Sequence, residues 1–144
     1  MSTTLKIALA QIAPVWLDKI ATLEKIENSI IQAAVEKCEL IVFGEALLPG
    51  YPFWLALTGG AEWNTTLNKE LHAHYVSNSI CIEKGDLDSV CKLAKQYNMA
   101  IYMGIIERPT DRGGHSIYAS LVYINEKGKV KSVHRKLQPT YDER

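Results

Sequence analysis

Two short apolar runs with a long amphipathic segment between them set the first constraint on the fold. The runs are residues 5–12 and Leu40–Phe43, and each has the length and composition of a buried strand. Between them, apolar residues recur every three or four positions, which predicts a helix over residues 17–37 with one buried face. Because a helical crossover of this length returns the chain to the same edge of a sheet, we expect the two strands to be parallel.

The rest of the chain continues this alternation and then ends in a hairpin. We expect helices over residues 62–79 and 86–97, and strands over residues 100–106, 118–124 and 130–135. Strands that alternate with helices predict an α/β layered domain. No repeat or interdomain linker divides the sequence.

Composition and charge exclude two classes of partner. Sixteen Lys and Arg residues balance 16 Asp and Glu residues, and no basic run is longer than residues 134–136, so we expect no nucleic-acid partner. The apolar runs are far shorter than the roughly 20 residues of a membrane span, so we expect no membrane partner and a cytoplasmic protein. The three cysteines, Cys38, Cys81 and Cys91, are odd in number and lack metal-ligand spacing, which favours free thiols in a reducing compartment.

Two charged residues follow predicted strands and are candidates for chemistry. Glu45 comes just after Leu40–Phe43, and Lys136 comes just after residues 130–135. If these two strands are near neighbours, the two side chains would face one cleft, where each charge favours the ionised form of the other. The alternative is a loop carboxylate and a solvated lysine at a strand end.

A long loop after Glu45, residues 45–60, is rich in Gly, Pro and aromatic residues. Loops of this length are uncommon unless they are functional, and Tyr51, Phe53 and Trp54 would suit the wall of an apolar substrate pocket. The alternative role for these aromatic side chains is packing. His72 and His74 lie two positions apart on a predicted helix and so point to different faces, which argues against a shared metal site.

Four stretches resemble the nitrilase branch of the carbon-nitrogen hydrolases. Phe-Gly-Glu-Ala-Leu-Leu-Pro-Gly-Tyr-Pro at residues 43–52 looks like the family's glutamate motif, and His-Arg-Lys-Leu-Gln-Pro-Thr-Tyr-Asp-Glu-Arg at residues 134–144 looks like its lysine motif. Lys-Glu-Leu-His-Ala-His-Tyr at residues 69–75 and Met-Ala-Ile-Tyr-Met-Gly-Ile-Ile-Glu-Arg at residues 99–108 also resemble the family. The resemblance therefore covers essentially the whole chain, and the form of the lysine motif points to nitrilases proper.

This resemblance implies an α-β-β-α sandwich and a Glu-Lys-Cys active site without a cofactor or metal. Glu45 would be the general base for a cysteine thiol, which attacks the nitrile carbon and forms a thioimidate. Lys136 would stabilise the developing charge, and Glu143 would position the hydrolytic water or the lysine. The expected partners are a small-molecule nitrile and further copies of the chain in a homo-oligomer.

The nucleophilic cysteine is missing from the expected place. The family carries it after the lysine motif, in a Gly-rich turn before Trp-Glu, and the sequence reaches Arg144 without such a motif. Cys38 lies on the far side of the strand that precedes Glu45, and neither Cys81 nor Cys91 follows a strand or sits in a Gly-rich turn.

We therefore expect residues 1–144 to be the N-terminal portion of a single carbon-nitrogen hydrolase domain, inactive alone, with the nucleophile encoded further on. Half of such a sandwich should leave one apolar face of its sheet uncovered. Two alternatives stay open: a related amidase or carbamoyl hydrolase that uses the same residues, and a non-catalytic half-domain that serves as an assembly module.

Overall fold

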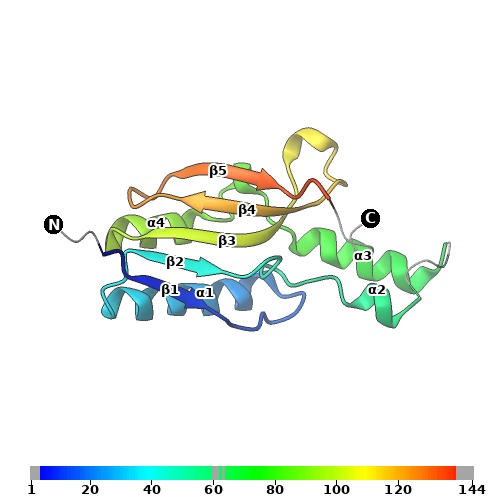
Figure 1. The fold of residues 1–144 in the computed structure, drawn as a ribbon. Coiled ribbons are helices and arrows are strands. Elements are labelled where there is room, and N and C mark those ends of the chain that lie inside the picture. Colours follow the sequence, from blue (N-terminus) through cyan, green and yellow to red (C-terminus); the bar gives the residue numbers. More distant parts are fainter. Residues whose placement is uncertain (1–3, 60–61, 63, 139–144) are drawn as a thin grey trace.

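One five-stranded sheet organises the chain. Figure 1 shows the computed structural model, which describes residues 4–59, 62 and 64–138. Within that part of the chain the strands lie in sequence order: β1 (Ile7–Ala10), β2 (Leu40–Phe43), β3 (Ala100–Glu107), β4 (Tyr118–Ile124) and β5 (Val130–Arg135). β1, β2 and β3 are parallel, and β4 and β5 continue the sheet in antiparallel pairing. The predicted parallel start and hairpin end are both confirmed.

Two helices cover one face of this sheet. Helix α1 (Lys19–Val35) begins at Asp18, whose carboxylate accepts a hydrogen bond from the Ala21 amide, and helix α4 (Asp88–Tyr97) ends at Asn98 in the left-handed conformation. Their buried side chains form one core cluster with the inward residues of β2, β3 and β4, namely Ile26, Ile30, Ala33, Val90, Ala94, Ile41, Phe43, Ile101, Met103, Ile105, Val122 and Ile124. The chain is therefore an α/β layered unit with its core between the helices and the sheet.

Two further helices lie beyond one end of the sheet (Figure 1). They are α2 (Trp54–Leu57) and α3 (Thr66–Asn78). The long loop predicted over residues 45–60 thus contains one helical turn, and the predicted helix 62–79 begins later and ends one residue earlier. Short 3₁₀ helices lie in two connections: η1 (Ile82–Lys84) between α3 and α4 (Asp88–Tyr97), and η2 (Thr110–Arg112) between β3 and β4.

The prediction of a largely buried first strand is wrong. β1 is an edge strand shorter than expected, with Ile7 46% and Leu9 79% exposed. Both side chains point away from α1 and α4, because successive residues of a strand face opposite sides of the sheet and Ala8 and Ala10 are the ones packed against the core. An apolar run therefore marks this strand correctly but does not reveal that one face lacks a helical cover.

The face opposite the helices is apolar and partly exposed. One row across it runs from Leu9 through Val42 and Tyr102 to Tyr123, with the last two rings stacked 4.7 Å apart between centroids. Leu121, on the same face, is 42% exposed. The expected uncovered sheet face is therefore present in this structure. Among the residues that the structure describes, every helix is too short or too polar to serve as a membrane span.

Candidate active site

The chain leaves the sheet directly after β2, lies against the face of β3 at Gly104, and then pairs with β3 again. Val42 pairs with Tyr102, and the next backbone pairing with β3 is the bridge between Leu48 and Ile105, where the Ile106 amide donates to the Leu48 carbonyl over 2.9 Å. Six residue steps from Val42 to Leu48 (48 − 42) therefore lie opposite only three steps from Tyr102 to Ile105 (105 − 102). The surplus residues form a bulge that carries Glu45.

Gly104 is what lets this bulge lie against β3. A Cβ atom at Gly104 would lie 2.3 Å from the Gly44 carbonyl oxygen, 2.6 Å from the Glu45 Cα and 2.8 Å from the Ala46 nitrogen. All three are backbone atoms, so any larger residue would displace the bulge. Sequence reasoning missed Gly104 as a site residue, although a glycine inside a strand pattern is a recognised sign of a close backbone approach.

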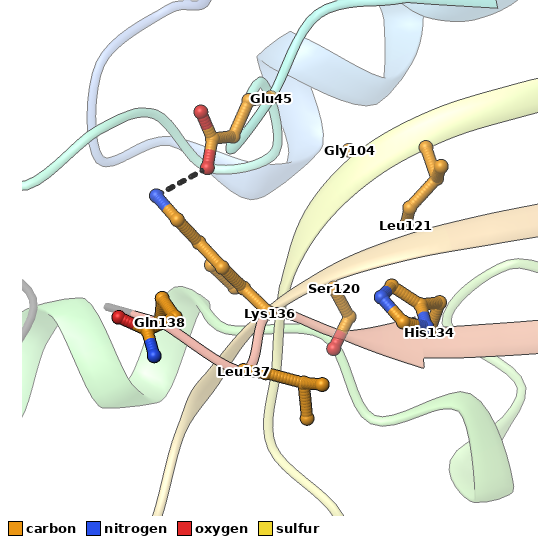
Figure 2. A pocket seen from close by; sticks show the side chains of 9 residues that line it. Glu45, Gly104, Ser120, Leu121, His134, Lys136, Leu137 and Gln138 are labelled. Carbon is orange, nitrogen blue, oxygen red and sulfur yellow. Dashed lines mark hydrogen bonds and ion pairs between the residues drawn. The ribbon is translucent and has the colours of Figure 1, made fainter. Parts of the chain in front are cut away.

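Lys136 reaches the same face of the sheet from the β5 edge. Its amide donates to the Ala119 carbonyl over 2.8 Å, which extends the pairing of β5 with β4 by one residue. Its Nζ lies 2.8 Å from Oε1 of Glu45. Figure 2 shows the two side chains pointing toward one another. The two residues, 91 positions apart in sequence, therefore form an ion pair.

We expected Glu45 and Lys136 to face one cleft if their strands were near neighbours, and that condition is wrong. β2 and β5 are not neighbours, because β3 and β4 lie between them. Glu45 and Lys136 meet because the bulge at Gly104 carries Glu45 across β3 towards β5, and not because their strands are adjacent.

A cavity of about 520 Å³ lies beside the ion pair, within the size range of small-molecule sites. Its described walls combine the charged pair with small and apolar groups: Glu45, Gly104, Ala119, Ser120, Leu121, His134, Lys136, Leu137 and Gln138. The Glu45 side chain is 59% exposed and that of Lys136 29%, and so open a pair contributes at most about 1 kcal/mol to stability. The fold therefore gains little from this pair, and the carboxylate and ammonium stay accessible to a ligand.

The other predicted site residues lie elsewhere or outside the described chain. Glu143 belongs to residues 139–144, which the structure does not describe. Phe53 is 59% exposed and its ring lies 5.1 Å from that of Tyr51, whereas Trp54 is 4% exposed and packs edge-on against Tyr75. None of these three aromatic side chains lines the described walls of the cavity, so their pocket role stays a prediction. For Trp54 the structure shows packing.

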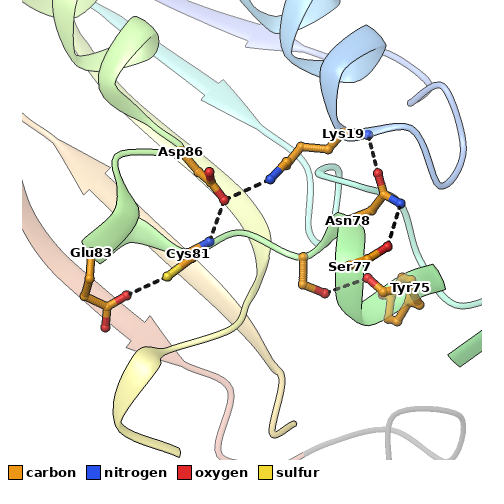
Figure 3. Close-up of polar contacts among 8 residues, drawn as sticks. Lys19, Tyr75, Ser77, Asn78, Cys81, Glu83 and Asp86 are labelled. Atoms are coloured by element: carbon orange, nitrogen blue, oxygen red, sulfur yellow. Dashed lines mark hydrogen bonds and ion pairs between the residues drawn. The ribbon is translucent and has the colours of Figure 1, made fainter. Parts of the chain in front are cut away.

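None of the three cysteines lines the described walls of the cavity. Cys81 is buried, and its thiol donates to the Glu83 carboxylate, while its amide and Lys19 both bind Asp86, as Figure 3 shows. Burial raises the pKa of Cys91, with a further increase from the nearby Asp88 charge, so its reactive thiolate form is disfavoured. Cys38 packs against the core just before β2.

From their spacing, we predicted that His72 and His74 do not share a metal site. The His74 ring lies 3.1 Å from the Leu17 carbonyl, a contact that joins α3 to the start of α1. In the parts of the chain that the structure describes, no three His, Cys, Asp or Glu side chains gather as metal ligands would.

A second ion pair lies next to the site. Arg135 donates two hydrogen bonds of 2.8 Å to Glu107, whose carboxylate is 6% exposed, and Ser120 donates a third of 2.7 Å. The hydrogen bonds from Arg135 hold the pKa of Glu107 below its usual range, although burial alone would raise it. Glu107 is therefore an ionised, hydrogen-bonded group in the sheet.

We expect Glu107→Gln to lower the free energy of unfolding by about 2 kcal/mol at pH 7, because it leaves the Arg135 charge without its counter-ion. A carboxyl whose pKa is lowered in the folded state stabilises the fold above the unfolded pKa and loses that effect as pH falls through the folded pKa. The difference between wild type and Glu107→Gln should therefore shrink below about pH 4. Urea unfolding at pH 7 and pH 3 measures it, with the exposed Glu24→Gln as control. A difference that is the same at both pH values would contradict this account.

The fold and the site define an α/β domain with a carboxylate–lysine pair beside a cavity, and comparisons with known proteins place it further. The family model of the carbon-nitrogen hydrolases matches residues 6–144. This chain belongs to the carbon-nitrogen hydrolase family.

Similar proteins carry nitrilase names. The chain is 34% identical over 139 residues to "Nitrilase 2" of an unknown prokaryotic organism, covering 96% of this chain and 42% of that protein. It is 34% identical over 144 residues to an arylacetonitrilase of Fusarium vanettenii, covering 100% of this chain and 40% of that protein. The chain thus spans about two fifths of the length of these curated relatives.

Solved structures show the same fold at lower identity. The carbon-nitrogen hydrolase of Helicobacter pylori G27 matches with a TM-score of 0.65 and 19% identity, over 96% of this chain and 42% of that one. The C. elegans NitFhit protein matches with a TM-score of 0.65 and 16% identity, over 94% of this chain and 29% of that one. The predicted nitrilase-like α/β fold class is therefore confirmed for the residues that the structure describes.

Proposed function

We propose that this chain is the N-terminal portion of a single hydrolase domain that converts a nitrile into its carboxylic acid and ammonia. The observation that carries the proposal is the 2.8 Å contact between Glu45 and Lys136 beside a cavity. Similarity to nitrilase-named proteins supports a nitrile as substrate. The nucleophilic thiol would come from a cysteine beyond Arg144, since none of Cys38, Cys81 and Cys91 lines the described cavity.

In the first half of the proposed reaction, Glu45 takes the proton of the thiol and the thiolate adds to the nitrile carbon. One carbon–nitrogen π bond breaks as the sulfur–carbon bond forms, and the nitrogen gains negative charge. The Lys136 ammonium stabilises that charge, and protonation of the nitrogen gives a thioimidate. Glu45 would thus activate the nucleophile that attacks the nitrile carbon, and Lys136 would stabilise the charge that forms on the nitrogen.

In the second half, water adds to the thioimidate carbon, and the carbon–nitrogen bond breaks as the nitrogen leaves as ammonia. The resulting thioester is hydrolysed by a second water, which releases the carboxylic acid and restores the thiol. Glu143 would position the water or Lys136 in these steps. These proposed steps require no cofactor.

The name arylacetonitrilase among the relatives supports a nitrile with an aromatic group as a first substrate to try. Leu121 and Leu137 give the described cavity an apolar wall that such a group could contact. Cytoplasmic location and homo-oligomeric assembly stay predictions.

Product analysis with paired substrates tests the proposal. The protein with its complete domain is supplied separately with an arylacetonitrile and with the corresponding amide, and acid and ammonia are quantified. We expect acid and ammonia in equal amounts from the nitrile. Acid from the amide alone would favour a related amidase or carbamoyl hydrolase, which could use the same Glu45–Lys136 pair on a carbonyl substrate.

A non-catalytic assembly module is the second candidate, and the exposed apolar sheet face with Leu9 79% exposed favours it. It predicts stable oligomers and no turnover of either substrate.

A further inference from the structure

A hydrogen-bonded group spans three strands, and its side chains lie on the opposite face of the sheet from those of Glu45 and Lys136, although Ser120 also borders the cavity. It consists of Glu107 on β3, Ser120 on β4 and Arg135 on β5. Ile105 and Ser120 are paired, as are Ser120 and Arg135, which places this row on the helix-covered face. Lys136 follows Arg135 directly and therefore projects to the other face.

This group fixes the end of β5. In the described sheet β5 is an edge strand that pairs only with β4, and the ends of edge strands open easily. Arg135 holds this end through two parallel hydrogen bonds to Glu107, and its guanidinium lies 4.4 Å from the centre of the Tyr118 ring. The tie therefore connects β5 across β4 to β3.

β3 also carries the other partner of the site. The backbone of Glu45 lies against Gly104, three residues before Glu107 on the same strand. The positions of Glu45 and Lys136 are thus both fixed relative to β3. Glu45 is held by backbone contact, and Lys136 is held through Arg135. A lysine side chain has four rotatable bonds, so where its Nζ can reach depends on how firmly its backbone is held.

We propose that Glu107 and Arg135 are positioning residues that set the place of Lys136 relative to Glu45. Glu107 and Arg135 do not contact the substrate. They act through the backbone of Lys136. The kinetic arm of the test rests on the proposed nitrile hydrolysis, whereas the structural arm does not. Misplacement of a reacting group by about 1 Å can cost on the order of a hundredfold in rate, which is the scale of effect to look for.

The test compares Arg135→Lys and Glu107→Gln with wild type, in the protein with its complete domain. Arg135→Lys keeps the positive charge but loses the two-pronged hydrogen bond, so it is the variant most certain to fold. The control is Lys131→Gln, which removes an exposed cation from the same strand without touching Glu107. Circular dichroism at the assay temperature verifies that each variant is folded.

Two readouts are taken on each folded variant. We expect kcat to fall at least about tenfold in both variants while KM stays within about twofold, because Lys136 acts on charge that develops in the transition state. In crystal structures of the variants, we expect Nζ of Lys136 to have moved away from Oε1 of Glu45, compared with 2.8 Å here. Lys131→Gln should match wild type in both readouts.

The outcomes separate the two proposals. An unmoved Lys136 together with wild-type kcat in both folded variants overturns the positioning role. A displaced Lys136 in a protein whose wild type hydrolyses neither nitrile nor amide supports the positioning role and contradicts the proposed function. A fall in kcat with Lys136 still in place also overturns positioning, since the effect would then arise elsewhere.

Discussion

Lys136→Ala, made in the protein with its complete hydrolase domain, is expected to lower kcat by at least about a hundredfold, because a fixed positive charge beside the reacting bond is lost. The Lys136 side chain is 29% exposed and its pairing with Glu45 contributes little to stability, so the variant should remain folded. Turnover of an arylacetonitrile measures the effect, and urea unfolding measures the stability.

Glu45→Gln is the matched variant for the other partner. It keeps the size of the side chain and removes the base, so we expect a loss of kcat as large as that of Lys136→Ala. The double variant should be little worse than either single variant, because residues that act as a unit are not additive. Retained activity in either folded single variant would rule out the assignment of this pair.

The second large effect is expected from Gly104→Ala. The added methyl group would lie 2.3 Å from the Gly44 carbonyl oxygen, so the bulge must move and take Glu45 with it. We expect kcat to fall about a hundredfold and the free energy of unfolding to decrease by about 1–3 kcal/mol, as for other overpacked sites. Steady-state kinetics and urea unfolding of the same preparations measure the two losses.

Gly44→Ala is the control for added volume in the same bulge. A Cβ atom there meets no described heavy atom within 4 Å, and the backbone of Gly44 does not require positive φ. Its stability should be close to that of wild type. If Gly104→Ala retains wild-type turnover, the close approach at β3 does not set the position of Glu45.

Local patterns predicted most of the elements. β2, β4 and β5 have the predicted bounds. β2 and β4 are largely apolar runs, whereas β5 is more polar and is marked by the glycine-containing turn before it. The exposure of β1 escaped prediction because it depends on which face of the sheet the helices cover. That arrangement involves contacts between distant segments, which the period of one strand does not encode.

The candidate site was predictable in its residues but not in its geometry. A carboxylate and a lysine after strands pointed to Glu45 and Lys136, yet their strands are separated by two others. Only the close approach at Gly104 brings the pair together, and the sequence shows it as a single glycine in a strand. The aromatic residues of the loop illustrate the opposite case, since composition cannot separate the packed Trp54 from the exposed Phe53.

The most direct test of the central claim is mass spectrometry of the complete protein after brief exposure to a nitrile substrate, followed by peptide mapping. We predict a substrate-derived adduct on a cysteine beyond residue 144, formed by wild type and absent from Glu45→Gln. An adduct on Cys38, Cys81 or Cys91, or product formation in which no cysteine is ever modified, would contradict the account.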